Sequence, residues 1–478
     1  MKERRKKLDA IRAAGMDPYP ARVPRSFDIS HAIEHFDKLA ASAKKVSLVG
    51  RIKSLRDQGK IVFVDIVDET GKMQLVVKGE NLKDLEFWRS VLDLGDFISA
   101  TGLLFTTIRG EKSIEVTALR MAAKSLLPLP DNWAGLEDED QRLRKRYLDL
   151  VATAELHELF RKKAVFWDTF RTALKKEGFL EVELPVMEIL PGGAEAEPFK
   201  THHNALDTDF YLRISLELPL KKLLVGGFDK VFEIGRIFRN EGIDREHLQD
   251  YTQLEFYWAY HDYNDVMALV EKLYKNVIKK TCGTLQTRYN GQMLDWSKAW
   301  PRIDYVDIFK KENGIDPLAA TERELRDHAK KLGLDTKGHL GKGRLIDLVY
   351  KRTVRPKLIQ PAFLIDPPVE VVPLAKRLEH DPRRVARMQP VAGGTELGTG
   401  YSELNDPLDQ LARFEEQMKL REAGDTEAQR LDEDFVEALE YGMPPAGGFG
   451  VSERLFAVLM DRPIREIVFF PLMRPKKE

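Results

Sequence analysis

The sequence has very little cysteine, no long apolar run and almost no net charge. Its single cysteine, Cys282, excludes an internal disulfide bond and a cysteine-based zinc site. No run of about 18 apolar residues occurs, and charged residues open the chain where an apolar signal core would lie, so we expect a cytoplasmic protein without a membrane anchor. The formal net charge of −1 excludes bulk attraction to nucleic acid, so any RNA-binding surface must be local.

The composition is that of a folded protein with more than one domain. Hydrophobic residues make up 43% and charged residues 32% of 478 residues, which is enough apolar content to form buried cores. We predict an α+β protein with four parts: an N-terminal helical extension (1–44), an OB-fold domain (45–123), a linker rich in proline and turn formers (124–145), and a large second domain (146–478) with a helical insertion around 300–355.

Five short segments rich in β-branched residues follow the N-terminal extension, with a charged helical stretch between the third and the fourth. They are residues 46–54, 60–68, 72–78, 95–105 and 113–121. This order is typical of a five-stranded OB β-barrel, and such barrels often bind single-stranded nucleic acid by stacking bases on aromatic side chains. We expect Gly71 to supply a positive φ in the turn after the second strand.

Two side chains of this predicted barrel are candidates for reading an anticodon. Phe63 could stack on a base and Gln74 could contact a base edge. Either residue could equally pack the barrel, and a barrel that serves only as a scaffold is the alternative interpretation.

The start of the second domain and one of its hairpins carry clear periodic patterns. Residues 154–177 have apolar residues at helical spacing and end before Gly178, which predicts an amphipathic helix. Residues 230–239 and 253–260 alternate as strands, the first with Phe232, Ile234 and Phe238 on its apolar face.

If the strands 230–239 and 253–260 pair antiparallel, Arg239 lies close to Glu255 and Tyr257. The plain alternative is an Arg–Glu pair that only holds a hairpin. The loop between them, which includes Glu241 and residues 244–247, carries more ionisable groups than a turn requires. That density favours a site that handles phosphate and metal.

Several stretches together resemble the class II aminoacyl-tRNA synthetases, in the form carried by the lysyl-tRNA synthetases. They are GFLEVELPVM (178–187), the segment 191–236 that opens PGGAEAEPFK, FRNEG (238–242) with QLEFYWAYHDYND (253–265), ELGTGYSELNDP (396–407), and 447–475 from GGFGVSERL to FPLMRP. The resemblance implies a catalytic domain built on an antiparallel sheet flanked by helices. It also implies activation of L-lysine with ATP, transfer to tRNA(Lys), and a homodimer to which the helix 154–177 contributes.

The resemblance also implies which residues bind ATP. Attack of a carboxylate on the α-phosphate of ATP needs alignment and charge stabilisation more than covalent work by the protein. Arg239 would hold the α-phosphate and the substrate carboxylate, and Arg454 would stack on adenine opposite Tyr251; these two arginines are the predicted catalytic residues. The further predicted ATP ligands are Glu241, His247 and Glu396, and Glu396 would also bind Mg²⁺.

A pocket for lysine must bind two ammonium groups, and therefore needs carboxylates. By the resemblance, Gly193 and Glu217 would contact the α-amino group, and Glu403 would bind the ε-ammonium. The other predicted lysine ligands are Arg239, Glu255, Tyr257, Thr399 and Tyr401. Thr399, Tyr401 and Glu403 share strand parity, whereas Glu396 does not, so we predict a break or bulge near Gly398 or Gly400.

The chain departs from the family's pattern at several positions. Gln389 stands where the family has a second metal carboxylate; with Glu396 and Glu403 it completes the predicted metal set, but it offers a carbonyl oxygen and no charge. Thr399 stands where Asn is usual, and HLQDY (247–251) stands where the family reads H-N-P-E-F. The last motif is one residue short, with Ser452 in place of a glycine.

Three other functions are compatible with parts of the pattern. A synthetase for aspartate or asparagine would need a cation in the side-chain pocket, where this chain offers Glu217, Glu255 and Glu403. A protein-lysylating paralogue of the family lacks the N-terminal barrel. A catalytically silent RNA-binding protein or scaffold would have no need of the arginine and glutamate residues predicted to bind ATP.

Overall fold

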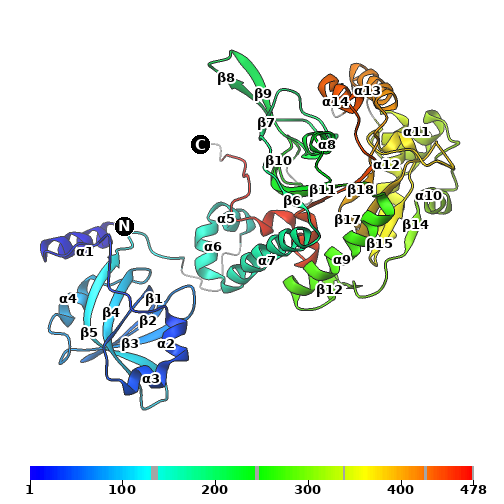
Figure 1. Ribbon diagram of the computed structural model, residues 1–478. Helices are drawn as coiled ribbons and strands as arrows, with labels where there is room; N and C mark the ends of the chain where they lie inside the picture. Colours follow the sequence, from blue (N-terminus) through cyan, green and yellow to red (C-terminus); the bar gives the residue numbers. More distant parts are fainter. Residues whose placement is uncertain (131–137, 243–246, 337–339, 425–427, 476–478) are drawn as a thin grey trace. The chain divides into compact units, whose positions relative to one another are not determined.

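The chain forms two compact units, Met1–Leu136 and Glu137–Glu478 (Figure 1). The structure, a computed structural model, describes residues 1–130, 138–242, 247–336, 340–424 and 428–475. In these parts of the chain no helix is both long and apolar enough to cross a membrane.

The first unit is a closed five-stranded barrel whose strands follow one another in the order β1-β2-β3-β5-β4. This confirms the predicted OB β-barrel, including the helix between the third and fourth strands. Its elements are β1 (Val46–Gln58), β2 (Ile61–Val67), β3 (Lys72–Lys78), α4 (Leu85–Val91), β4 (Phe97–Thr106) and β5 (Lys112–Ala123). Strand alternation turns Val62, Val64 and Ile66 of β2 into the core, where each is at most 3% exposed.

The same alternation places Phe63 and Gln74 on the outer side of the barrel. Phe63 is half-buried, and the guanidinium of Arg56 lies 5.9 Å from its ring centre. Gln74 pairs with Asp65 in the ladder between β2 and β3, and its side-chain oxygen accepts a hydrogen bond from Ser113 Oγ at 3.1 Å. Their roles in reading an anticodon stay predictions.

The turn between β2 and β3 forms differently from our expectation. Gly71 does not have a positive φ. The Asp68 carboxylate closes the turn instead, because it accepts hydrogen bonds from the backbone N–H groups of Thr70 (2.8 Å) and Gly71 (3.0 Å). A Cβ at Gly71 would lie 3.2 Å from the Ile29 side chain, so glycine permits the helix that begins at Ile29 to pack closely on the turn.

The N-terminal extension packs on the barrel and shares its core. It contains α1 (Lys2–Ala13), α2 (Ile29–Glu34) and α3 (Phe36–Ala41). Ile11, Ile29 and Phe36, one from each helix, belong to the same cluster of buried apolar residues as the strands. The extension is therefore part of the barrel unit and forms no separate core.

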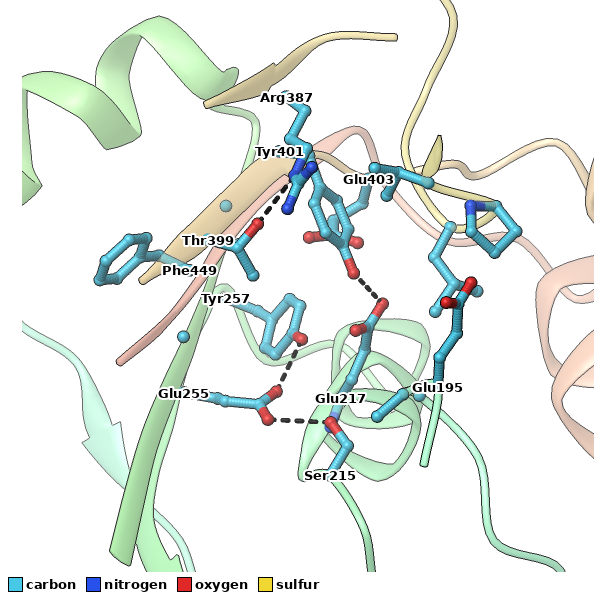
Figure 2. A pocket seen from close by; sticks show the side chains of 18 of the residues that line it. Glu195, Ser215, Glu217, Glu255, Tyr257, Arg387, Thr399, Tyr401, Glu403 and Phe449 are labelled. Carbon is cyan, nitrogen blue, oxygen red and sulfur yellow. Dashed lines mark hydrogen bonds between the residues drawn. The ribbon is translucent and has the colours of Figure 1, made fainter. Parts of the chain in front are cut away.

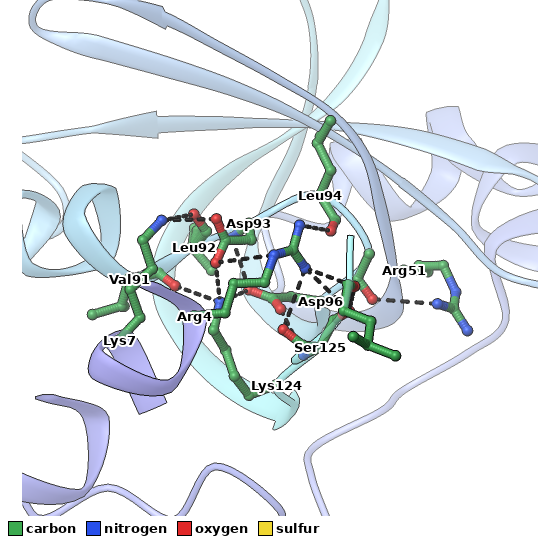
Figure 3. Close-up of polar contacts among 12 residues, drawn as sticks. Arg4, Lys7, Arg51, Val91, Leu92, Asp93, Leu94, Asp96, Lys124 and Ser125 are labelled. Carbon is green, nitrogen blue, oxygen red and sulfur yellow. Dashed lines mark hydrogen bonds and ion pairs between the residues drawn. The ribbon is translucent and has the colours of Figure 1, made fainter. Parts of the chain in front are cut away.

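A buried cluster of charges joins the end of β5 to the loop before β4 (Figure 3). Lys124, whose side chain is fully buried, lies 2.6 Å from Asp93 Oδ2 and 2.8 Å from Asp96 Oδ2. From α1, Lys7 contacts Asp93 at 2.7 Å, and Arg4 donates to the backbone oxygen of Leu94 at 3.1 Å. Lys124 falls within the predicted linker, but these contacts anchor it to the barrel.

The second unit is built on a large mixed sheet with the strand order β14-β15-β16-β18-β19-β11-β10-β6. These strands are β6 (Leu180–Glu181), β10 (Lys230–Phe238), β11 (Asp250–Ala259), β14 (Arg302–Asp304), β15 (Ala362–Ile365), β16 (Arg387–Ala392), β18 (Thr399–Ser402) and β19 (Ala446–Ser452), and β17 (Thr395–Glu396) pairs with β16. Smaller sheets contain β7 (Met187–Glu188), β8 (Lys200–His203) and β9 (Thr208–Leu212), and β12 (Gln286–Tyr289) with β13 (Gln292–Asp295).

The helices of this unit cover the sheet and its ends. They are α5 (Glu139–Arg144), α6 (Arg146–Ala152), α7 (Ala154–Lys176), α8 (Glu217–Val225), α9 (Tyr263–Cys282), α13 (Pro407–Glu422), α14 (Glu433–Glu440) and α15 (Arg454–Leu459), with a short turn of helix η3 (Ile464–Ile467). The predicted helix 154–177 matches α7, and Gly178 after it has φ +85°. Our linker extended to residue 145, but α5 already begins at Glu139.

The two faces of the central strand β11 have different roles. Leu254 and Phe256 are fully buried on one face, where the aromatic contacts reach Phe179 and, through Phe449, Tyr274 of α9. Gln253, Glu255 and Tyr257 project from the other face and line a cavity. This confirms the alternation predicted for residues 253–260.

The hairpin of β10 and β11 is antiparallel as predicted, but its register differs in detail. Glu255 pairs with Glu233, and the Arg239 backbone N–H bonds to Gln249, so Arg239 lies at the far end of the hairpin. In β10 Phe232 is fully buried as predicted, but so are Val231 and Ile237, whereas Ile234 and Phe238, which we also placed on the apolar face, are half-buried. The strand twists near its end and departs there from simple alternation. At this point the Phe238 N–H donates a hydrogen bond to the Arg213 carbonyl oxygen.

The helical insertion predicted around 300–355 contains α10 (Tyr305–Asn313), α11 (Glu322–Lys331) and α12 (Lys342–Thr353), followed by η1 (Arg355–Lys357). These helices have a core of their own, to which Phe309, Leu325 and Ile346 contribute. A further short helix, η2 (Val369–Val371), lies beside α12. The insertion is therefore a small packed layer at one edge of the sheet.

Replacement of Lys124 by Met is expected to destabilise the barrel unit by about 3–5 kcal/mol, because Asp96 would stay buried without its cation. The Lys124→Met/Asp96→Asn double variant should recover part of this loss. Lys83→Met, at an exposed position of the same unit, serves as the matched control. Calorimetric unfolding of the full chain measures the effect, and an unchanged transition in Lys124→Met would contradict the assigned role.

Candidate active site

Two adjoining cavities open beside the polar faces of β11, β18 and β19. The smaller has a volume of about 240 Å³ and the larger about 690 Å³. Residues that line both are Glu195, Arg239, Gln253, Arg387, Thr399 and Gly450. Because the cavities share this wall, a molecule bound in one would lie next to a molecule bound in the other.

The smaller cavity is a buried acidic pocket (Figure 2). Glu217 opens α8, Glu255 comes from β11, and Glu403 follows β18. They are only 5%, 3% and 1% exposed, respectively. The structure thus brings together three carboxylates that the sequence places far apart, as we predicted for a pocket that binds ammonium groups.

A fourth charge, Lys221, lies against this pocket and was not predicted. Its ammonium is fully buried and lies 2.5 Å from Glu217 Oε1 and 2.5 Å from Glu403 Oε2. The sequence contained a signal, because Lys221 follows Glu217 by four residues on a helix whose other residues are mostly apolar. Lys221 balances one of the three negative charges.

Hydrogen bonds fix the other oxygen atoms of the pocket. Glu255 Oε1 accepts from Ser215 Oγ (2.9 Å) and from Leu216 N–H (3.1 Å), and Glu255 Oε2 accepts from Tyr257 Oη (3.0 Å). Tyr401 donates its hydroxyl to Glu217 Oε1 at 2.5 Å. Figure 2 shows Tyr257 and Tyr401 pointing toward these carboxylates. The predicted residues therefore form one connected network.

Some buried oxygen atoms of the pocket lack a hydrogen-bond donor in the described parts of the chain, among them Gln429 Oε1 and Glu403 Oε1. A Cβ at Gly448 would lie 2.3 Å from Glu403 Oε1 and 2.5 Å from the Tyr257 ring, so only glycine at this position of β19 admits both side chains. A buried acceptor without a donor costs free energy, which a ligand with an N–H group would recover.

The pKa values of Glu403, Glu255 and Lys221 are shifted upward. Burial raises the pKa of Glu403 well above its usual range, although Lys221 acts against it. Burial, and then the charge of Glu217, raises the pKa of Glu255. Burial by itself would lower the pKa of Lys221, but Glu217 and Glu403 outweigh it and raise that pKa. The cluster is therefore too negative for its surroundings and would be stabilised by an added cation.

Gly193 is another predicted residue of this pocket. Its backbone packs closely against the Glu217 side chain. It has φ +80°, and a Cβ there would lie 3.0 Å from Glu217 Cβ and 3.1 Å from Ser215 Cβ. A side chain would be strained by the backbone and would press on both residues. Glycine therefore brings the backbone of this loop close to the carboxylate.

The larger cavity collects the residues predicted to bind ATP. They are Arg239, Glu241, His247, Tyr251, Glu396 and Arg454, and the cavity is also lined by Gln389, predicted as a metal ligand, and Thr399, predicted as a lysine ligand. The guanidinium of Arg239 lies 5.7 Å from the Tyr251 ring centre and donates to the Ile214 carbonyl oxygen at 3.2 Å. Residues 244–246 of the same loop, which we had included among its ionisable groups, lie outside the described residues.

Arg454 is placed by its neighbour Glu453, which is fully buried. Glu453 accepts a hydrogen bond from Thr252 N–H at 3.0 Å and lies 2.8 Å from Lys163 Nζ of α7. The start of α15 is thereby attached both to β11 and to α7. This attachment holds Arg454 at the wall of the larger cavity, although the last motif is one residue short.

The strand that carries Glu396 is interrupted as predicted. β17 ends at Glu396 and β18 begins at Thr399, so Leu397 and Gly398 separate the two. Glu396 consequently faces the larger cavity, whereas Tyr401 and Glu403 face the smaller one. Thr399 Oγ1 accepts from Arg387 Nε at 3.0 Å and orients this arginine, which we had not predicted, at the wall that both cavities share.

The three residues predicted to bind metal do not gather at one point. Glu396 and Gln389 line the larger cavity, whereas Glu403 lines the smaller one beside Lys221. Within the described ranges, no group of three or more His, Cys, Asp or Glu side chains could enclose a metal ion. A Mg²⁺ ion bound mainly by nucleotide phosphates and water needs only one or two carboxylates, and Glu396 could supply one.

Comparison with known proteins agrees with this geometry. The family described as tRNA synthetases class II (D, K and N) matches residues 138–474, and the OB-fold nucleic acid binding domain matches residues 46–122. The lysine–tRNA ligase of Moorella thermoacetica is 45% identical over 100% of this chain and 98% of its own length. Those of Roseiflexus castenholzii and Thermotoga maritima are 44% and 41% identical, each over 99% of this chain and 98% and 96% of theirs. The chain belongs to the class II tRNA synthetases of the aspartate, lysine and asparagine group.

Proposed function

We propose that the protein is a lysine–tRNA ligase, which activates L-lysine with ATP and transfers it to tRNA(Lys) in the cytoplasm. Relatives that carry the name lysine–tRNA ligase match nearly the whole chain at 40–45% identity. The family alone leaves aspartate and asparagine open, so the choice of amino acid depends on the pocket.

The charge balance of the acidic pocket is the observation that carries the choice of lysine. At the buried end of the pocket, Glu217, Glu255 and Glu403 exceed the one built-in cation, Lys221, by two negative charges, whereas Arg239 and Arg387 lie with Glu195 at the wall shared with the larger cavity. Free lysine brings two ammonium groups, one at each end. A substrate with a carboxylate side chain would add a third negative charge to a buried site, which is strongly unfavourable.

The unpartnered atom Glu403 Oε1 supports a place for the ε-ammonium. An ammonium group donates three hydrogen bonds, and Glu403 Oε1 and the Tyr257 side chain lie together against Gly448. The α-amino group would then lie toward Glu217 and the backbone at Gly193. Thr399 and Tyr401 complete the wall between these two ends.

Arg239 would align the two substrates, because it lines both cavities. Its planar fork can bind the lysine carboxylate on one side and the α-phosphate on the other. The carboxylate oxygen then attacks the α-phosphate and pyrophosphate leaves, with the negative charge that develops held by Arg239. Tyr251 and Arg454 would hold the adenine, and Glu241 and His247 would contact ATP from the loop.

Mg²⁺ would neutralise phosphate charge on the bound ATP, with Glu396 as its carboxylate ligand from the protein. Gln389 could add only a neutral oxygen. The barrel would bind the anticodon through Phe63 and Gln74 on its outer side, where aromatic stacking and base-edge contacts are both available. A silent scaffold is the main alternative, and its distinguishing property would be the absence of lysine-dependent exchange between ATP and pyrophosphate.

Pyrophosphate exchange measured with each amino acid tests the proposal directly. We expect exchange with lysine and none with aspartate or asparagine. Glu403→Gln should raise the lysine KM by at least about thirtyfold and leave the ATP KM nearly unchanged, because loss of one partner from a desolvated charge pair costs about 2–5 kcal/mol. Glu415→Gln, on an exposed part of α13, is the control. Equal lysine KM values in both variants would remove the assignment.

Lys221 gives a second prediction, because it is the counter-ion of the pocket. Lys221→Met should lower the free energy of unfolding by about 3–5 kcal/mol, since Glu217 and Glu403 would remain buried without it. Lys222→Met is a matched control, because Lys222 pairs with Asp434 at the surface and its loss should cost less than about 1 kcal/mol. Urea unfolding compares the two, and similar losses would disprove the role of Lys221.

We also propose that the protein is a homodimer. The segment that follows α7 leaves apolar side chains exposed: Leu180 is 47%, Met187 53% and Ile189 74% exposed. Exposed apolar residues that lie close together mark surfaces where proteins associate. Sedimentation at micromolar concentration should give the mass of two chains, and Ile189→Lys should shift the equilibrium toward one. A monomer at that concentration would contradict the proposal.

A further inference from the structure

The larger cavity contains two cations that the sequence resemblance did not assign. Lys351 lies in the last turn of α12, and Arg355 follows it by four residues in η1. Both line the cavity together with Gln389 and Glu396. The Lys351 side chain is 45% exposed, and its position in the lining means that it is accessible from the cavity.

The backbone fixes this position. Gly393 N–H bonds to the Ile359 carbonyl oxygen at 2.8 Å, and Gly394 N–H bonds to the Leu358 carbonyl oxygen at 2.9 Å. These bonds tie the segment after α12 to the turn between β16 and β17, the strands that carry Gln389 and Glu396. The short helix η1, which follows α12, lies beside β17. The two cations are therefore held beside the residues predicted to bind metal.

Two like charges four residues apart on a helical segment repel each other, so their neighbours must compensate. Asp347 lies 2.8 Å from Lys351 Nζ and supplies one negative charge. Burial by itself would lower the pKa of Lys351, but Asp347 and Glu396 together raise it, so the side chain keeps its proton at neutral pH. The cation is thus retained and is held by its ion pair with Asp347.

The charges of the cavity agree with a single divalent ion. Five cationic side chains, Arg239, Lys351, Arg355, Arg387 and Arg454, face three carboxylates, Glu195, Glu241 and Glu396. ATP carries about four negative charges at neutral pH. With Asp347, which pairs with Lys351, counted among the negative charges, the protein contributes one excess positive charge, so one Mg²⁺ and these side chains neutralise most of the charge of ATP. A second divalent ion would meet the neutral Gln389 and two cations in place of a second carboxylate.

We propose that Lys351 and Arg355 bind the phosphates of ATP directly and replace a second divalent ion, so that the protein binds ATP with a single Mg²⁺. This inference rests on the proposed function, because it concerns the same nucleotide cavity. A lysine ammonium and an arginine fork are both good donors to phosphate oxygens. Their positions are fixed before ATP binds, which removes the need to recruit a mobile ion.

Calorimetric titration of the full chain with ATP, in the absence of lysine, tests the contacts. In EDTA, Lys351→Met should weaken ATP binding about tenfold, the usual loss for a hydrogen bond to a charged group. Lys351→Arg keeps the charge and should retain most of the affinity. Lys357→Met, a lysine outside the cavity that pairs with Glu312, is the matched control and should bind like the unmodified chain. Equal ATP affinity in Lys351→Met and the unmodified chain would overturn the inference.

Binding of Mn²⁺, a paramagnetic substitute for Mg²⁺, tests the number of ions. With saturating ATP we expect one Mn²⁺ per chain by electron paramagnetic resonance, and two would overturn the inference while leaving the proposed function intact. Absence of ATP binding by the unmodified chain with excess Mg²⁺ would instead reject the proposed function, and this inference with it.

Discussion

The interaction on which the site depends is the burial of three carboxylates around a single lysine. Glu217, Glu255 and Glu403 lose nearly all contact with water, and Lys221 compensates only one of them. Such an arrangement is unfavourable on its own, because burial disfavours the charged forms. It persists because the surrounding sheet and helix α8 impose it, and in the proposed function its remaining negative charge would select a doubly cationic amino acid.

The sheet makes this possible by separating its two faces. One face of β11 contributes to the main apolar core, so burial of apolar side chains on that face supports the strand that carries the site. The opposite face presents Gln253, Glu255 and Tyr257, and the glycines of β19 leave room above them. Lys163 of α7 then holds Glu453 next to Thr252, so the helix that precedes the sheet also positions the nucleotide wall.

Patterns along the chain predicted most of the architecture, and the resemblance predicted most of the lining. Alternation located the barrel strands and β11, and the opposite parities of Glu396 and Glu403 predicted the interruption that puts them in different cavities. Other features arise only from contacts between distant segments. Neither the packing of Ile29 on Gly71 nor the shifted position of Arg239 in its hairpin can be read from periodicity, because both depend on register.

Lys221 and Lys351 escaped the sequence analysis for a related reason, since lysines are usually solvated and only a fold can show which of them face a site. In the structure, Lys221 lies at the smaller cavity, where negative charge is in excess, and Lys351 lies at the larger cavity, where positive charge is in excess. In the proposed mode of binding, lysine would place its ammonium groups toward Glu217 and Glu403, and ATP would place its phosphates toward the cations. The substrate carboxylate and the α-phosphate would then meet at Arg239, which lines both cavities, and charge complementarity would contribute to their alignment before the chemical step.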